Sequence, residues 1–154
     1  LDLAFARVFK DHLPDRLRTH HFSQSRLVLL IPDNHELADS FSGELATLRH
    51  EKFVFLQDSA GIGLTSHTLQ ACRQNQLHPE NIMSVPSLMS IPGLVAAGIG
   101  LSIVPETMTR LTMPGIRIVP LAQPEMVSEL SLISRIDERS SAVLHFIEEA
   151  QGWG

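Results

Sequence analysis

The sequence has a single cysteine, Cys72, among its 154 residues, so an internal disulfide is excluded. A chain without disulfides fits a reducing compartment. No apolar stretch reaches the roughly 18 residues that a membrane-spanning helix needs. No segment with a charged start and an apolar middle opens the chain, as a signal peptide would. We therefore expect a cytoplasmic protein that does not enter a membrane.

Basic residues are also few and scattered. Lys and Arg number 12 against 17 Asp and Glu, which gives a formal net charge of -5. The densest basic group, Arg16, Arg18 and Arg26, has Asp15 beside it and no aromatic side chains on which bases could stack. Because phosphate contacts require a basic face, we expect that this chain does not bind DNA by itself.

Patterns typical of catalysis or metal binding are missing as well. The eight histidines, His67 among them, lack the Cys or carboxylate companions that metal ligands usually show at helical or turn spacing. Cys72 is expected on the inner face of a helix, as a packed thiol rather than a nucleophile. There is no Gly-x-Ser-x-Gly elbow, and residues 93–100 lack the Lys and Ser/Thr of a phosphate-binding loop. We expect no catalytic residue, no metal and no cofactor, and a protein that is not an enzyme.

Short apolar runs alternate with helical patterns along the chain. Strands are predicted at 1–6, 27–31, 53–56, 82–85, 101–104, 116–119 and 130–134. Helices are predicted at 64–76, 105–111 and 140–150, and a further helix runs to Ala97 from a cap at Ser87 or Ser90. Elements that alternate at this spacing indicate crossover connections and a mainly parallel sheet flanked by helices. The predicted fold class is α/β. On the last helix, the expected buried face consists of Val143, Phe146, Ile147 and Ala150.

Two predicted strand-to-helix corners are candidate binding positions, because ligands bind at the carboxyl ends of parallel strands. In the first corner, Gly61 and Gly63 let a ligand approach the main chain, and the helix start offers unpaired N–H groups. Ser59 is a better contact there than Asp58, whose carboxylate opposes an anion unless it caps the helix or turns away. A tight glycine loop without a ligand is the alternative. The second corner has Ser87, whose hydroxyl can bond a carboxylate.

Residues 94–105, LVAAGIGLSIVP, resemble the signature of the effector domain of LysR-type regulators. Other landmarks stand in the order typical of that family: LDLAF at 1–5, LVLLIPDNHELA at 27–38, EKFV at 51–54, Cys72 followed by LHP at 77–79, and IVPL at 118–121. The resemblance spans nearly the whole chain. It implies a fold like the type 2 periplasmic binding proteins, in which two crossing strands join two α/β lobes and the effector lies between them.

The same resemblance implies one complete lobe plus part of the second. Residues 1–23 would form a partial first lobe and hinge, 24–126 the second, regulatory lobe, and 127–154 the hinge return and the C-terminal helix of the first lobe. Because Leu1 opens on an apolar strand without its neighbours, we expect a cut-down piece of a longer protein. The missing parts would be the rest of the first lobe and the N-terminal helix-turn-helix and linker helix that bind DNA.

The resemblance further assigns effector contacts to the loop of the second lobe, to the edge of the cleft and to the hinge. These are Ile62, Gly63 and Leu64 in the loop, Ser87 at the cleft edge, and Val127 and Arg7 in the hinge. Arg7 would meet a carboxylate; a surface arginine at a strand end is the alternative. The implied partners are a small effector, DNA through the missing domain, and further copies in a homo-oligomer that involves the helix at 64–76. The helix N-termini, the serines and Arg7 favour an anionic effector.

The leading interpretation is therefore the sensing domain of a LysR-type transcriptional regulator, in which effector binding between the lobes changes the DNA-bound oligomer. A solute-binding protein of a transporter, with the same fold, is the alternative; a leader sequence upstream would indicate it. An enzyme acting on an anionic substrate is the least supported class, because no nucleophile–base pair stands out.

Overall fold

The computed structural model describes residues 3–6, 13–58, 63–110 and 113–153, and it confirms the α/β class. The strands are β1 (Leu3–Ala6), β2 (Leu17–Pro32), β3 (Lys52–Leu56), β4 (Asn81–Val85), β5 (Ser102–Pro105), β6 (Ile116–Pro120) and β7 (Val127–Arg135). The α-helices are α1 (Leu64–Gln74), α2 (Ile91–Ala96) and α3 (Ser141–Gln151), and the short 3-10 helices are η2 (Leu45–Leu48), η3 (Leu88–Ser90) and η4 (Glu106–Arg110).

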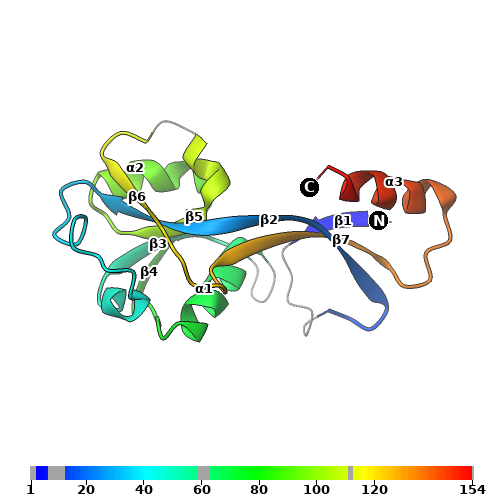
Figure 1. Cartoon of the computed structure of the whole chain (residues 1–154), viewed down its shortest axis with the longest axis horizontal. Coiled ribbons are helices and arrows are strands. Elements are labelled where there is room, and N and C mark those ends of the chain that lie inside the picture. Colours follow the sequence, from blue (N-terminus) through cyan, green and yellow to red (C-terminus); the bar gives the residue numbers. More distant parts are fainter. Residues whose placement is uncertain (1–2, 7–12, 59–62, 111–112, 154) are drawn as a thin grey trace.

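The long strand β2 runs through both halves of the molecule (Figure 1). Its first half pairs antiparallel with β7, from Leu17 opposite Arg135 to Arg26 opposite Val127. Only the apolar second half was predicted as a strand. The first half, LRTHHFSQSR, is polar and mostly not buried, so it lacks the hydrophobic pattern of a strand and is held by main-chain pairing to β7.

The core lies on both sides of the second half of β2. Leu27 and Leu29 belong to one apolar cluster, and Val28 and Leu30 belong to another. All four are at most 1% exposed, because successive side chains point to opposite faces of the sheet and both faces are covered. The predicted packed thiol of Cys72 is confirmed: it comes from α1 and lies in the first cluster.

Helices α1 and α2 lie on opposite sides of this sheet (Figure 1). Helix α2 places Ile91 and Val95 in the second cluster, opposite the face on which α1 packs. This arrangement, a sheet with a helix on each face, explains why residues 27–31 read as one uninterrupted apolar run rather than as an alternating pattern.

Parallel pairing is limited to one part of the described sheet. Strands β3 and β4 are parallel, and an isolated parallel bridge joins Phe53 to Leu101 just before β5. All other described strand pairs, which involve β2 or β7, are antiparallel. The α/β class is thus confirmed, but most described strand pairs are antiparallel and not parallel as predicted, because β2 and β7 pair antiparallel with their neighbours.

The end of the molecule opposite this core carries β1 and α3 (Figure 1). Strand β1 pairs with β7, and α3 buries Ile147 and Ala150 as predicted. Phe146 differs from the prediction: its side chain is 37% exposed and meets Trp153 edge-on, with ring centroids 5.6 Å apart. Among the described residues, no helix is both long and apolar enough to cross a membrane.

Candidate functional site

The parallel register of β3 and β4 places their carboxyl ends together. Leu56 is paired with Val85, and the main-chain N–H of Gln57 donates to the carbonyl oxygen of Val85 at 2.7 Å. The chain therefore leaves both strands at the same edge of the sheet, toward α1 in one case and toward Ser87 in the other. The shared edge that the sequence predicted for the two corners is present.

Asp58 acts at the first corner as the cap of α1. Its Oδ2 accepts hydrogen bonds from the N–H groups of Thr65 at 2.7 Å and Ser66 at 3.4 Å. A carboxylate at this position satisfies N–H groups that the first helical turn leaves unpaired, and it interacts favourably with the helix dipole. The predicted free N–H groups are therefore not available at Thr65 and Ser66, and Asp58 serves the helix rather than a ligand.

Gly63 is required by the closeness of this cap. Its φ of 117° is unfavourable for residues with a side chain, and a Cβ at this position would lie 2.5 Å from Oδ2 of Asp58. The next residue, Leu64, is 8% exposed, so its side chain is buried in the core. Arg7, Ser59, Gly61 and Ile62 lie outside the described residues.

Ser87 is exposed at the second corner and caps the short helix that follows β4. Its Oγ accepts from the main-chain N–H of Met89 at 3.3 Å, and its carbonyl oxygen accepts from the hydroxyl of Ser90 at 2.7 Å. The hydroxyl hydrogen of Ser87 is not used by the Met89 bond, since the oxygen is the acceptor there. Ser87 therefore retains the capacity to donate to a carboxylate oxygen.

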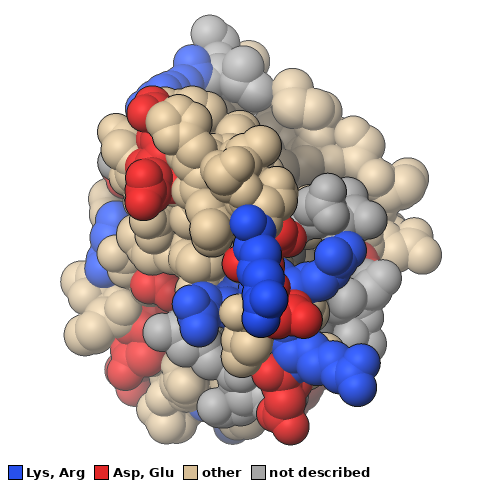
Figure 2. Space-filling view, turned by 90° about the vertical axis from the view of Figure 1, so that its right-hand side faces the viewer, with Lys and Arg blue, Asp and Glu red and all other residues tan. Residues whose placement is uncertain are grey.

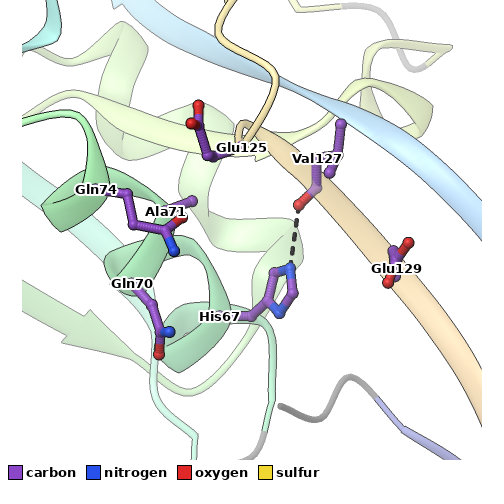
Figure 3. Close-up of a pocket in the computed structure, with 7 residues that line it drawn as sticks. All are labelled: His67, Gln70, Ala71, Gln74, Glu125, Val127 and Glu129. Atoms are coloured by element: carbon purple, nitrogen blue, oxygen red, sulfur yellow. Dashed lines mark hydrogen bonds between the residues drawn. The ribbon is translucent and has the colours of Figure 1, made fainter. Parts of the chain in front are cut away.

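Val127 begins β7 and lines a pocket of about 280 Å³ between that strand and α1 (Figure 3). The lining consists of His67, Gln70, Ala71, Gln74, Glu125, Val127 and Glu129. Nε2 of His67 lies 3.1 Å from the carbonyl oxygen of Val127. Because a carbonyl oxygen only accepts, this nitrogen carries the proton, and the bond joins the first turns of α1 to the strand that leaves this half of the molecule.

The sequence did not predict this role of His67, which was considered only as a metal ligand and rejected as one. A signal was available in the spacing: positions 67, 70, 71 and 74 follow the i, i+3, i+4, i+7 pattern of one helix face. The side chains are polar except at Ala71, so a search for apolar periodicity passes over this face.

Two other histidines are paired with carboxylates rather than grouped around a metal position. His35 lies 3.1 Å from Glu51, and His50 lies 3.2 Å from Glu80. No group of three or more His, Cys, Asp or Glu within the described ranges could hold a metal ion. Positive and negative side chains are interleaved on the face that Figure 2 shows, where the described residues form no continuous basic surface.

Comparison with known proteins identifies the family. The family model of the LysR substrate binding domain matches residues 1–154. The chain belongs to the LysR substrate-binding domain family. This LysR domain is 36% identical to the uncharacterized HTH-type transcriptional regulator YnfL of Escherichia coli (strain K12) over 135 residues. The matched segment covers 87% of this chain and 46% of YnfL. It is 27% identical over 123 residues to the HTH-type transcriptional regulator AlsR of Bacillus subtilis (strain 168), covering 80% of this chain and 41% of AlsR.

Solved structures show the same fold. Full-length BenM superposes with a TM-score of 0.82 at 24% identity, covering 99% of this LysR domain and 50% of BenM. The effector-binding domain of QuiR in complex with shikimate has a TM-score of 0.78 at 21% identity, covering 99% of this chain and 71% of that one. These neighbours are effector-binding domains with the type 2 periplasmic-binding-protein-like fold, as the sequence predicted. The chain spans about half the length of the curated relatives it matches.

Proposed function

We propose that this LysR domain senses a small organic acid for a transcriptional regulator, and that the acid binds where β3 and β4 end. The observation that supports this site most directly is the parallel register from Lys52 opposite Asn81 to Leu56 opposite Val85. It brings two strand-to-helix corners to one edge, the position at which open α/β sheets bind ligands. Relatives named as transcriptional regulators favour a regulator over a transport protein or an enzyme.

The proposed contacts are those predicted from the sequence: Arg7, Ser59, Gly61, Ile62, Gly63, Leu64, Ser87 and Val127. The proposed lobes are also unchanged, with 24–126 as the regulatory lobe between the parts at 1–23 and 127–154. An acid is the proposed ligand because Ser87 retains a donor and because solved neighbours bind acids. BenM has been solved with its effector benzoate and QuiR with shikimate, and both ligands carry a carboxylate.

In this proposal the domain regulates by differential affinity. An acid that binds one arrangement of the lobes better than another shifts the population toward that arrangement, and equal affinity would shift nothing. The signal would pass to a helix-turn-helix domain outside this chain, within a cytoplasmic homo-oligomer bound to DNA. The DNA part of this proposal is supported by full-length CbnR, which contains a domain of the same fold and has been solved in complex with its target DNA.

The test is calorimetric titration of the intact regulator with a panel of small organic acids, repeated for Ser87→Ala. We expect at least one acid to bind and the Ser87→Ala variant to bind it about five- to tenfold more weakly, as for a lost hydrogen bond of about 1 kcal/mol. Ser42→Ala, at another exposed serine, is the matched control and should bind as the wild type does. Failure of every acid to bind would contradict the proposal.

A further inference from the structure

A third strand ends at the same edge of the sheet. Because the bridge from Phe53 to Leu101 is parallel, β5 runs in the direction of β3, and its carboxyl end at Pro105 lies at the edge where β3 and β4 end. Strand β2 is antiparallel to β5 and pairs Leu27 with Pro105. Arg26 is therefore beside the start of η4, at the edge proposed for the effector.

A pocket of about 450 Å³ lies between β2 and η4. Its lining is entirely polar and consists of Gln24, Ser25, Arg26, Glu106, Thr107, Thr109 and Arg110. Two arginines and one glutamate are among these residues, so the pocket lining has a formal net charge of +1 within a chain whose net charge is -5. The side chains that line this pocket thus favour a negatively charged ligand, although the chain as a whole is negatively charged.

Neither arginine is neutralised by a carboxylate within the part of the chain that the structure describes. The ion pairs of the described residues include those of His35, His50, Arg117 and His145, but none of Arg26 or Arg110. Arg26 instead donates from Nη2 to the main-chain carbonyl oxygens of Leu121 and, at 3.4 Å, of Gln123. These neutral acceptors orient the guanidinium and leave its charge and most of its five N–H donors for another partner.

The helix start at the neighbouring corner does not supply the positive charge that an acid needs. Asp58 already occupies the N–H groups of Thr65 and Ser66 there, with a full negative charge. An anion at this edge therefore requires another source of donors. A planar guanidinium matches a carboxylate with two parallel hydrogen bonds, which an ammonium or a hydroxyl cannot do.

We propose that Arg26 and Arg110 bind a carboxylate of the organic acid at the β2 and β5 side of this edge, while Ser87 contacts another polar group of the acid at the β4 side, and that Glu106 opposes the carboxylate and thereby limits its affinity. This rests on the proposed function, because it names the charge-recognising residues of that same edge. The acid would lie with its carboxylate between β2 and η4, and the hydroxyl of Thr107 or Thr109 would be within the same pocket.

If charge drives binding at this site, removal of a positive side chain and removal of a negative one should change the Kd of an acid in opposite directions. The probes are a panel of small carboxylic acids and, for each, the corresponding uncharged primary amide, titrated into the intact regulator at constant ionic strength. We expect acids to bind and amides not to bind. Arg110→Gln and Arg26→Gln should each raise the Kd of a bound acid about tenfold or more, as for a lost charge-assisted hydrogen bond. Glu106→Gln should lower that Kd.

Controls separate folding from recognition. Arg26→Lys keeps the charge and should bind more tightly than Arg26→Gln. Arg110 lies in the last turn of η4, and no side-chain hydrogen bond or ion pair between described residues depends on it. Arg49→Gln, just before the opposite end of β3, should match the wild type. This subsite would be wrong if both Gln variants bound acids as tightly as the wild type does. It would also be wrong if acids and amides bound the wild type equally. In both cases a ligand still binds the regulator, and the proposed sensing function remains. If neither acids nor amides bind the wild type, both proposals are wrong.

Discussion

The carboxylate of Asp58 and the main-chain N–H of Thr65 are 2.7 Å apart, which ties the end of β3 to the first turn of α1. The hydroxyl of Thr65 donates back to the carbonyl oxygen of Leu56, so the two segments are joined twice. These two hydrogen bonds hold the first turn of α1 to the end of β3.

Removing the cap should destabilise the domain. We expect Asp58→Ala to lower the free energy of unfolding by about 1 to 2 kcal/mol, the range for lost helix N-caps. Urea unfolding of the intact protein measures this. Asp58→Asn keeps an acceptor oxygen and should lose less; an Asp58→Ala variant as stable as the wild type would show that the cap is not needed.

Substitution of Gly63 should be more costly than that of a glycine in open space. In Gly63→Ala the methyl group would meet Asp58 at a position where the backbone already disfavours a side chain, so we expect a loss of about 2 to 3 kcal/mol. Gly93, in α2, has no atom within 4 Å of an added Cβ and no positive φ. Gly93→Ala should therefore stabilise the protein by about 0.5 to 1 kcal/mol. Thermal unfolding measures both changes in stability. If Gly63→Ala and Gly93→Ala both stabilised or both destabilised the protein, this interpretation would be contradicted.

His67 should stabilise the contact between α1 and β7. His67→Ala removes the donor to the carbonyl oxygen of Val127, and we expect a loss of about 0.5 to 1.5 kcal/mol in the free energy of unfolding. Gln74→Ala truncates another side chain of the same pocket and is the matched control. If both variants lose the same amount in urea unfolding, the hydrogen bond adds nothing beyond packing.

The sequence allowed the second half of β2 and the two corners to be predicted, because each depends on local pattern. The run at 27–31 is apolar on both faces, and the corners follow from parallel strand order. The first half of β2 could not be predicted in this way, since its stability comes from pairing with a strand more than a hundred residues away. Arg26 and Arg110 were likewise not recognised together, because only the antiparallel pairing of β2 with β5 brings them to one pocket.

The thiol of Cys72 should be inert in the folded protein and should give stability a dependence on alkaline pH. Burial raises the pKa of Cys72 from 9.0 to about 12, although the positive charge of Arg73 acts in the opposite direction. Since the thiolate is the reactive form, we expect Ellman's reagent at pH 8 to label the native protein only when it unfolds.

The sign of the pH effect follows from the raised pKa. Above pH 9 the unfolded thiol ionises while the folded one stays protonated, so the unfolded state is favoured. This contribution to stability is complete below pH 9 and is lost as the pH rises from 9 toward 12. Urea unfolding between pH 7 and 11 should therefore show a steeper decline for the wild type than for Cys72→Ala, which lacks the titrating group. If stability fell equally with pH in the wild type and in Cys72→Ala, or if the native protein were labelled rapidly, Cys72 would not be buried from solvent.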